Sequence, residues 1–146
     1  MRAGILVLAL AMTSCAPRVP APAGVGDGSR WVQVRVAADS SSYDVDRLSI
    51  AKLTYQNTVV HGAWVRERLV KPPNIGSRRS VGYILDLQYF DCEAHTTVVV
   101  EQRYYQSGTE KFLSSFNNDV LPPQLMRITP QSTNEDLLRY VCAHQG

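Results

Sequence analysis

The feature that most constrains the fold is an alternation of apolar and polar side chains in several separate stretches. A period of two residues is typical of a β-strand with one buried face. The clearest stretch has Asp86 and Gln88 on one face. Its other face carries Tyr83, Leu85, Leu87 and Tyr89. We therefore expect a chain built mainly of β-sheet.

Further strands are expected on both sides of this stretch. Residues 32–36 alternate in the same way, and residues 96–105, TTVVVEQRYY, are rich in β-branched and aromatic types. Residues 50–55 and 59–69 predict two strands joined by a tight turn at Gln56-Asn57. Trp64 lies on the opposite parity from Ala63 and Val65, so the second of these strands is either covered on both faces or bulged.

The last element has the pattern of a helix. Ser132 and Glu135 have the spacing of a capping box, in which each side chain accepts a free backbone N–H at the helix start. The pairs Leu137–Val141 and Leu138–Cys142 are each four residues apart and form one apolar face. We expect a short C-terminal helix with Cys142 on its buried side.

The N-terminal residues read as an export signal. Arg2 precedes an apolar run over residues 3–12, which is about half of the roughly 20 residues that a membrane-spanning helix needs. The following MTSC resembles the lipobox of bacterial lipoproteins, which is cut just before a cysteine that receives lipid. We therefore expect a signal peptide at 1–14, lipidated Cys15 with a Pro/Gly-rich tether at 15–29, and a folded domain at 30–146.

Lipidation of Cys15 implies a location and a second covalent link. Ala16 stands where an aspartate would indicate retention in the inner membrane, so we expect a lipid anchor in the bacterial outer membrane. Whether the domain faces the surface or the periplasm stays open. Exported proteins meet oxidising conditions, and once Cys15 is lipidated the remaining cysteines, Cys92 and Cys142, are left to form a disulfide.

The sequence carries no pattern of catalysis or of a resident cofactor. The stretch DCEAH brings Asp91, Cys92, Glu93 and His95 together, but a zinc site usually needs a second cluster at defined spacing, and the sequence has none. Phosphate-binding glycine loops and serine-hydrolase elbows are also missing. The net charge is +2 with scattered basic residues, which disfavours a nucleic-acid partner. We expect a protein without enzymatic activity, metal or cofactor.

Two groups of side chains are candidates for binding. Five basic residues surround PPNIG, which we expect to be an exposed hairpin loop able to contact an anionic partner. They are Arg66, Arg68, Lys71, Arg78 and Arg79. Four tyrosines could form an aromatic surface for a planar ligand such as haem, although strand tyrosines more often pack against their neighbours. They are Tyr83, Tyr89, Tyr104 and Tyr105.

The order of short motifs along the chain resembles the surface-adhesin protein E family of proteobacterial lipoproteins. The motifs are WVQV, YDVDRLSI, AWVRER, FDC, YYQSG and LLRYVC. The resemblance implies an α+β domain in which an antiparallel sheet of about six strands is tied by a disulfide to a C-terminal α-helix. It also implies adhesins that bind host matrix and serum proteins, one of them linked to haem through a dimer.

Two functions of different class follow. The first is a non-catalytic binding module for host or neighbouring macromolecules, acting through a sheet face or the basic loop. The second is a periplasm-facing structural or accessory lipoprotein that serves an envelope complex. Carriage of a small, haem-like ligand is a third alternative, and homodimer formation stays open.

Overall fold

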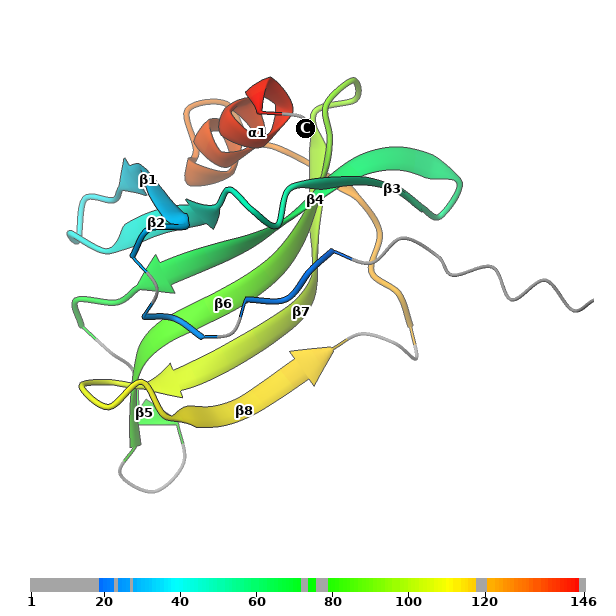
Figure 1. The fold of residues 1–146 in the computed structure, drawn as a ribbon. Coiled ribbons are helices and arrows are strands. Elements are labelled where there is room, and N and C mark those ends of the chain that lie inside the picture. The colour runs from blue at the N-terminus through cyan, green and yellow to red at the C-terminus, as the bar shows by residue number, and fades with distance from the viewer. Residues whose placement is uncertain are drawn as a thin grey trace, which may run out of the picture.

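The computed structural model describes residues 19–22, 24–26, 28–71, 74–75, 79–117 and 121–144. These residues form a twisted antiparallel sheet and one helix (Figure 1). The strands are β1 (Trp31–Val36), β2 (Ser42–Asp46), β3 (Ala51–Tyr55), β4 (Thr58–Arg68), β5 (Asn74–Ile75), β6 (Arg79–Asp91), β7 (Thr96–Gln106), β8 (Phe112–Asn117) and β9 (Met126–Arg127), and the helix is α1 (Thr133–Ala143).

Six of the strands form a continuous path in the order β1-β2-β4-β6-β7-β8, and every pairing along it is antiparallel. The short strands β3, β5 and β9 pair beside this path with β4, β6 and β7. The expected count of about six strands is therefore too low for the described part of the chain, which holds nine. The antiparallel sheet with a C-terminal helix is confirmed.

The β3–β4 hairpin has the tight turn that the sequence predicts. Tyr55 pairs with Thr58, and the two residues between them are Gln56 and Asn57. Both have positive φ, at 47° and 65°, as a two-residue turn that matches the strand twist requires. The hairpin places Tyr55 at its tip, where its side chain can reach neighbouring segments.

Strand β4 is covered on both faces, which settles the two readings of Trp64. Val65 lies on one side in a cluster with Phe90 of β6 and the helix residues Leu137 and Val141. Trp64 lies on the other side, in a separate cluster. From Val60 to Arg66 every residue of β4 is buried, so this central strand separates two small cores.

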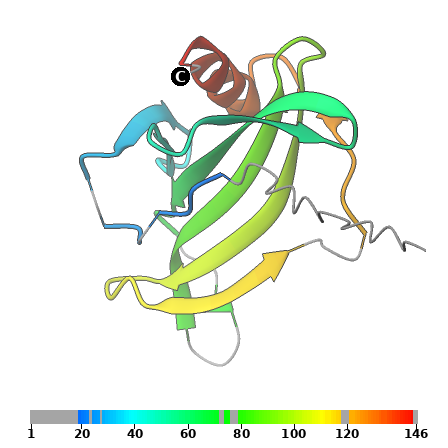
Figure 2. The same cartoon turned by 45° about the vertical axis from the view of Figure 1, so that its right-hand side comes forward.

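The second core is closed by the N-terminal segment, which we define as the described residues between 19 and 26. Val19 is 8% exposed and Val25 is 2% exposed, and both pack in the cluster of Trp31, Trp64 and Leu85. The segment crosses the sheet in front of β4 and β6 (Figures 1 and 2). The expectation that residues 15–29 form a tether away from the domain is thus wrong for this part, because its valines cover an apolar sheet face.

Helix α1 begins as predicted. Ser132 is its N-cap, and the Ser132 hydroxyl accepts the backbone N–H of Glu135 at 3.3 Å. The Glu135 carboxylate accepts the N–H of Gln131, one residue before the cap, in place of the N–H of Ser132. No helix in the described ranges is both long and apolar enough to cross a membrane.

The predicted disulfide is confirmed. Cys92, directly after β6, is bonded to Cys142 of α1 across a sequence separation of 50 residues. The bond holds the helix on the sheet face that carries Val65 and Phe90.

Removing the Cys92–Cys142 disulfide tests its contribution to the stability of the domain. Closing a loop of this length in the unfolded chain is worth roughly 4 kcal/mol. Cys142→Ser should therefore lower Tm by more than about 10 °C, at several degrees per kcal/mol for a domain of this size. Differential scanning calorimetry of the purified, unlipidated domain measures this change. Cys15→Ser is the matched control and should leave Tm unchanged; equal melting of all three proteins would contradict a stabilising role.

Candidate functional site

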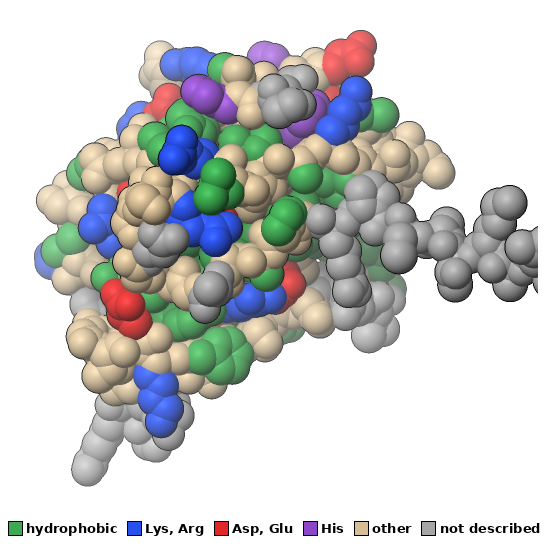
Figure 3. Space-filling view, viewed as in Figure 1, with side chains coloured by type: hydrophobic (Ala, Val, Ile, Leu, Met, Phe, Trp, Pro, Cys, Tyr) green, Lys and Arg blue, Asp and Glu red, His purple; other side chains and the backbone are tan. Residues whose placement is uncertain are grey.

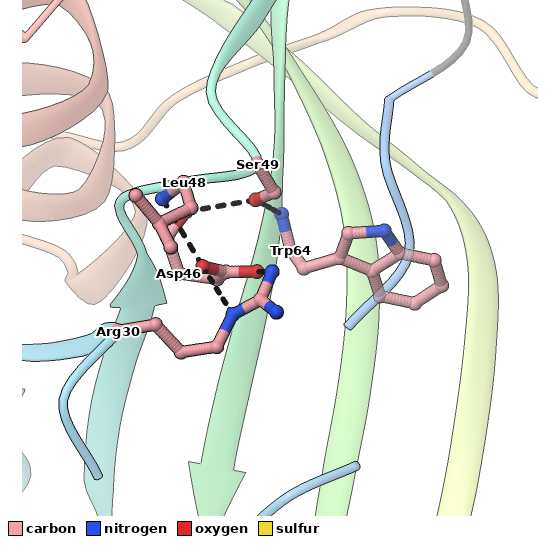
Figure 4. A network of polar contacts seen from close by, with 5 residues as sticks. All are labelled: Arg30, Asp46, Leu48, Ser49 and Trp64. Carbon is pink, nitrogen blue, oxygen red and sulfur yellow. Dashed lines mark hydrogen bonds and ion pairs between the residues drawn. The ribbon is translucent and has the colours of Figure 1, made fainter. Parts of the chain in front are cut away.

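The site is built on Trp64, whose backbone is fixed by a buried polar network (Figure 4). The Trp64 N–H donates to the Ser49 hydroxyl at 2.9 Å, and that hydroxyl donates to the backbone carbonyl of Asp46 at 2.8 Å. The Asp46 carboxylate, which is fully buried, is ion-paired with Arg30 and accepts the N–H of Leu48. This network ties the turn after β2 to β4. The indole ring extends away from it (Figure 4).

A groove of about 700 Å³ opens beside Trp64 on the sheet face that the N-terminal segment crosses. Strands β4, β6 and β7 supply side chains to it, and segments from both ends of the domain join them. The described residues that line it are Val19, Pro20, Ala21, Tyr55, Trp64, Leu87, Tyr89, Val100, Glu101, Arg103, Asn117, Pro122 and Pro123. Its volume lies within the range of ligand pockets.

The charged side chains of the groove are paired with each other. Arg103 Nε lies 2.6 Å from Glu101 Oε1, and the guanidinium carbon lies 4.5 Å from the centre of the Trp64 ring. A guanidinium over an indole face is attracted by the ring's quadrupole. The Trp64 Nε1–H, by contrast, is buried and has no acceptor among the described residues.

Two tyrosines form the aromatic wall of the groove. The rings of Tyr55 and Tyr89 meet edge to face with their centres 5.2 Å apart. The Tyr55 hydroxyl donates to the backbone carbonyl of Pro123 at 2.5 Å, which links the β3–β4 hairpin to the segment after β8. Burial of the hydroxyl raises the pKa of Tyr55.

The opposite sheet face has a polar region beyond the edge of α1. Burial raises the pKa of Asp86 to about 6, with the nearby Glu67 adding to the rise and a hydrogen bond from Gln102 opposing it. The Tyr43 hydroxyl donates to Glu67 at 2.7 Å, and burial followed by this bond raises the pKa of Tyr43. A cavity of about 490 Å³ lies beside Asp86, bordered also by Asn134 of the helix.

One of the five basic residues lies in the interior. Arg66 is 8% exposed and points onto the sheet face, where it donates to Asp44 Oδ2 at 2.7 and 2.9 Å. Its guanidinium also lies 4.6 Å from the Trp31 ring centre and donates to the Val25 carbonyl. Arg66 is therefore not part of an exposed loop: its charge is used within the domain because buried Asp44 needs a partner.

Of the other basic residues, Arg68 shares Asp44 with Arg66. Arg68 ends β4 and contacts Asp44 and Ser42, and Lys71 follows it in an exposed position. Arg78 and the side chain of Arg79 lie outside the described residues. Figure 3 shows Lys and Arg side chains on the visible face scattered among hydrophobic and uncharged ones. An anionic partner of this loop stays a prediction for Arg68, Lys71, Arg78 and Arg79.

The remaining candidates from the sequence are the DCEAH stretch and the four tyrosines. In DCEAH the Asp91 carboxylate accepts the N–H groups of Glu93 and Ala94, and Cys92 is in the disulfide. Across the described ranges, no three His, Cys, Asp or Glu side chains gather as metal ligands would. The four tyrosines are divided between the faces: three pack with the Trp64 cluster, while Tyr104 bonds Gln102 on the other face.

Sequence reasoning missed the groove residues Trp64, Tyr55 and Arg103. The off-parity position of Trp64 was a signal for it, because a large aromatic on the second face of a strand needs its own cover. Nothing in the sequence pattern placed the prolines of two distant segments beside it.

The Arg66–Asp44 pair can be tested by removing one partner. Arg66→Ala leaves Asp44 buried without its main cation and frees the Val25 carbonyl, so we expect a loss of about 3–5 kcal/mol in unfolding free energy. Urea denaturation measures it. Lys71→Ala, which removes an exposed cation, is the control and should change the unfolding free energy by less than about 1 kcal/mol. Equal small effects would show that the buried pair is not needed.

Asp86 predicts a pH dependence. Its pKa is about 6 in the folded chain against an ordinary 3.8, so the folded state binds more protons between these values and stability falls as pH rises from about 4 to 6. Asp86→Asn should thus stabilise the domain at pH 7.5, by at most about 3 kcal/mol at 1.4 kcal/mol per pKa unit. The gain should vanish near pH 4. Glu93→Gln, an exposed carboxylate, should change stability at neither pH.

Comparison with known proteins agrees with this architecture. The family model of surface-adhesin protein E matches residues 31–143, from the first residue of β1 to the last residue of α1. No curated protein and no solved structure matches the chain significantly. The match covers most of the sequence, including the disulfide and the sheet that carries the groove, and the chain therefore belongs to the surface-adhesin protein E family.

Proposed function

We propose that this chain is a lipid-anchored envelope protein of the bacterial outer membrane whose domain binds protein partners through the groove beside Trp64, without catalysing a reaction. Membership in the surface-adhesin protein E family supports an adhesin-like protein at the cell surface. Cys15 is the proposed attachment point of the lipid. The partner class that fits best is a host matrix or serum protein.

The observation that carries this proposal is the composition of the groove. Aromatic, proline and valine side chains supply apolar contact area, while the Arg103–Glu101 pair and Asn117 supply polar groups at one side. Aromatic side chains and arginine are enriched where proteins bind one another. The described lining contains no histidine, cysteine or serine that could act as a nucleophile or base. Such a surface favours binding over covalent chemistry.

The groove also has a stable foundation. Its floor lies on central strands, and Trp64 is held by the Ser49–Asp46 network beneath it. A binding surface on rigid strands keeps its shape before the partner arrives, which lowers the entropy lost on binding.

One experiment tests the anchor and the groove together. Intact cells that express the wild-type chain should retain labelled matrix or serum proteins, and the purified domain should bind them in a surface-plasmon assay. Cys15→Ser should abolish retention on cells while leaving the purified domain active. Arg103→Glu should weaken both by at least tenfold, because it reverses the charge in the groove.

Glu93→Gln, an exposed change away from the groove, is the control and should alter neither readout. Undiminished retention by Cys15→Ser cells would contradict the lipid anchor. Undiminished binding by the Arg103→Glu domain would contradict the groove. Binding by the purified domain combined with no retention on intact wild-type cells would contradict surface display and favour a periplasm-facing accessory role.

A further inference from the structure

The groove beside Trp64 already holds proline-containing segments of its own chain. Pro20 lies on one side, in the N-terminal stretch VPAP, and Pro122 and Pro123 lie on the other. Two side chains of the β3–β4 hairpin hold Pro122 and Pro123 by their backbone. The Tyr55 hydroxyl donates to the Pro123 carbonyl, and Gln56 Nε2 lies 3.3 Å from the Pro122 carbonyl.

This arrangement is the chemistry by which proline-rich chains are recognised. An extended proline-rich segment has no internal hydrogen bonds, and its carbonyl oxygens stay free to accept. Grooves that bind such segments are lined by aromatic rings, which pack against the proline rings. Tyr and Trp combine a large apolar surface with one donor each. The groove has three such side chains in Tyr55, Trp64 and Tyr89.

One donor in this set is unused. Trp64 is 1% exposed and lines the groove, yet its Nε1–H has no acceptor among the described residues. A buried donor without a partner destabilises the folded chain, because its hydrogen bond to water is lost and not replaced. The N-terminal segment therefore occupies its part of the groove without satisfying the Trp64 donor, and a chain that offers a carbonyl there would gain what this segment lacks.

The N-terminal segment is also attached in a way that allows exchange. It is attached at Val25, whose carbonyl accepts from buried Arg66, and at the buried residues Val19 and Pro22. Pro20 and Ala21 are exposed at the groove. Pro20 and Ala21 can therefore give way while Val19, Pro22 and Val25 stay in place.

We propose that the groove beside Trp64 is a recognition site for an extended proline-rich segment of a partner protein. The partner segment takes the place of Pro20 and Ala21, packs its prolines against Tyr55 and Tyr89, and accepts the Trp64 N–H with a backbone carbonyl. This proposal rests on the proposed function, because it names the partner chemistry of the same groove.

The probe is a nine-residue peptide with the sequence of residues 16–24, APRVPAPAG, blocked at both ends. Its matched control has the three prolines replaced by alanine. Isothermal titration calorimetry against the purified, unlipidated full domain should show at least tenfold tighter binding of the proline peptide. Equal binding of the two peptides, or no binding of either at millimolar concentration, overturns the proposal.

Variants locate the binding. Trp64→Phe keeps an aromatic ring and removes the donor, so the affinity for the proline peptide should fall about five- to tenfold. Tyr104→Phe, on the opposite sheet face, should leave the affinity unchanged. Since Trp64→Phe could impair folding, Asn117→Phe serves as a second variant: it narrows the groove from an exposed position and should weaken the peptide with Tm unchanged. Unaltered affinity in a folded Trp64→Phe or Asn117→Phe domain overturns the proposal.

The outcome is separable from that of the proposed function. If the domain binds matrix or serum proteins in an Arg103-dependent manner but ignores the proline peptide, the groove is a binding site of different partner chemistry and this inference alone fails. If the domain binds the peptide through Trp64 but no matrix or serum protein, the recognition chemistry stands and the partner class of the proposed function is wrong.

Discussion

The architecture depends on one buried cation. The guanidinium of Arg66 is bonded to Asp44 of the neighbouring strand, stacked on Trp31 of β1 and hydrogen-bonded to the backbone at Val25. A charge taken out of water is stable only when its partners are in place. One side chain therefore makes the pairing of β2 with β4, the position of β1 and the seating of the N-terminal segment dependent on one another.

This dependence explains how a thin domain keeps two cores. The helix covers one sheet face and is held there by the disulfide. Neither the helix nor the disulfide covers the other face. That other face carries Leu85, Trp64 and several tyrosines, and the described part of the chain offers no second helix to cover them. The N-terminal segment takes that role in part. The groove is the portion of the apolar face that the segment leaves open.

The sequence predicted the elements whose signals are local. Alternation identified β1 and β6, and enrichment in β-branched and aromatic residues identified β7. The Ser132 cap identified the start of α1, and the expected tight turn at Gln56-Asn57 identified the β3–β4 hairpin. Strand β2 has no apolar pattern in the sequence because two of its buried residues are carboxylates, Asp44 and Asp46. Each forms an ion pair with an arginine that is remote in the sequence. Strand β8, FLSSFN, has no alternation and is mostly exposed.

The groove lay beyond sequence reasoning for a similar reason. Its walls come from residues near 20, 55, 100 and 122, and only the sheet topology brings these together. Proline and glycine in residues 16–29 are typical of a tether, and composition does not show that two valines among them meet an apolar face. Basic residues were grouped by their closeness in sequence, but the sequence does not show that Arg66 is buried on Asp44 and under the Val25 carbonyl, whereas Arg68 ends the strand.

The burial of Val19 has a consequence for where the domain stands. If Cys15 carries lipid, only four residue steps, about 14 Å at full extension, separate the acyl chains from the first packed residue. The domain would then be held close to the headgroup layer, with the Val19 border of its groove within two Debye lengths of the lipid charges. A partner must come down to the bilayer to be captured. A short linker between the lipid and Val19 would therefore favour flexible partner chains that can extend to the membrane surface over rigid partners that cannot.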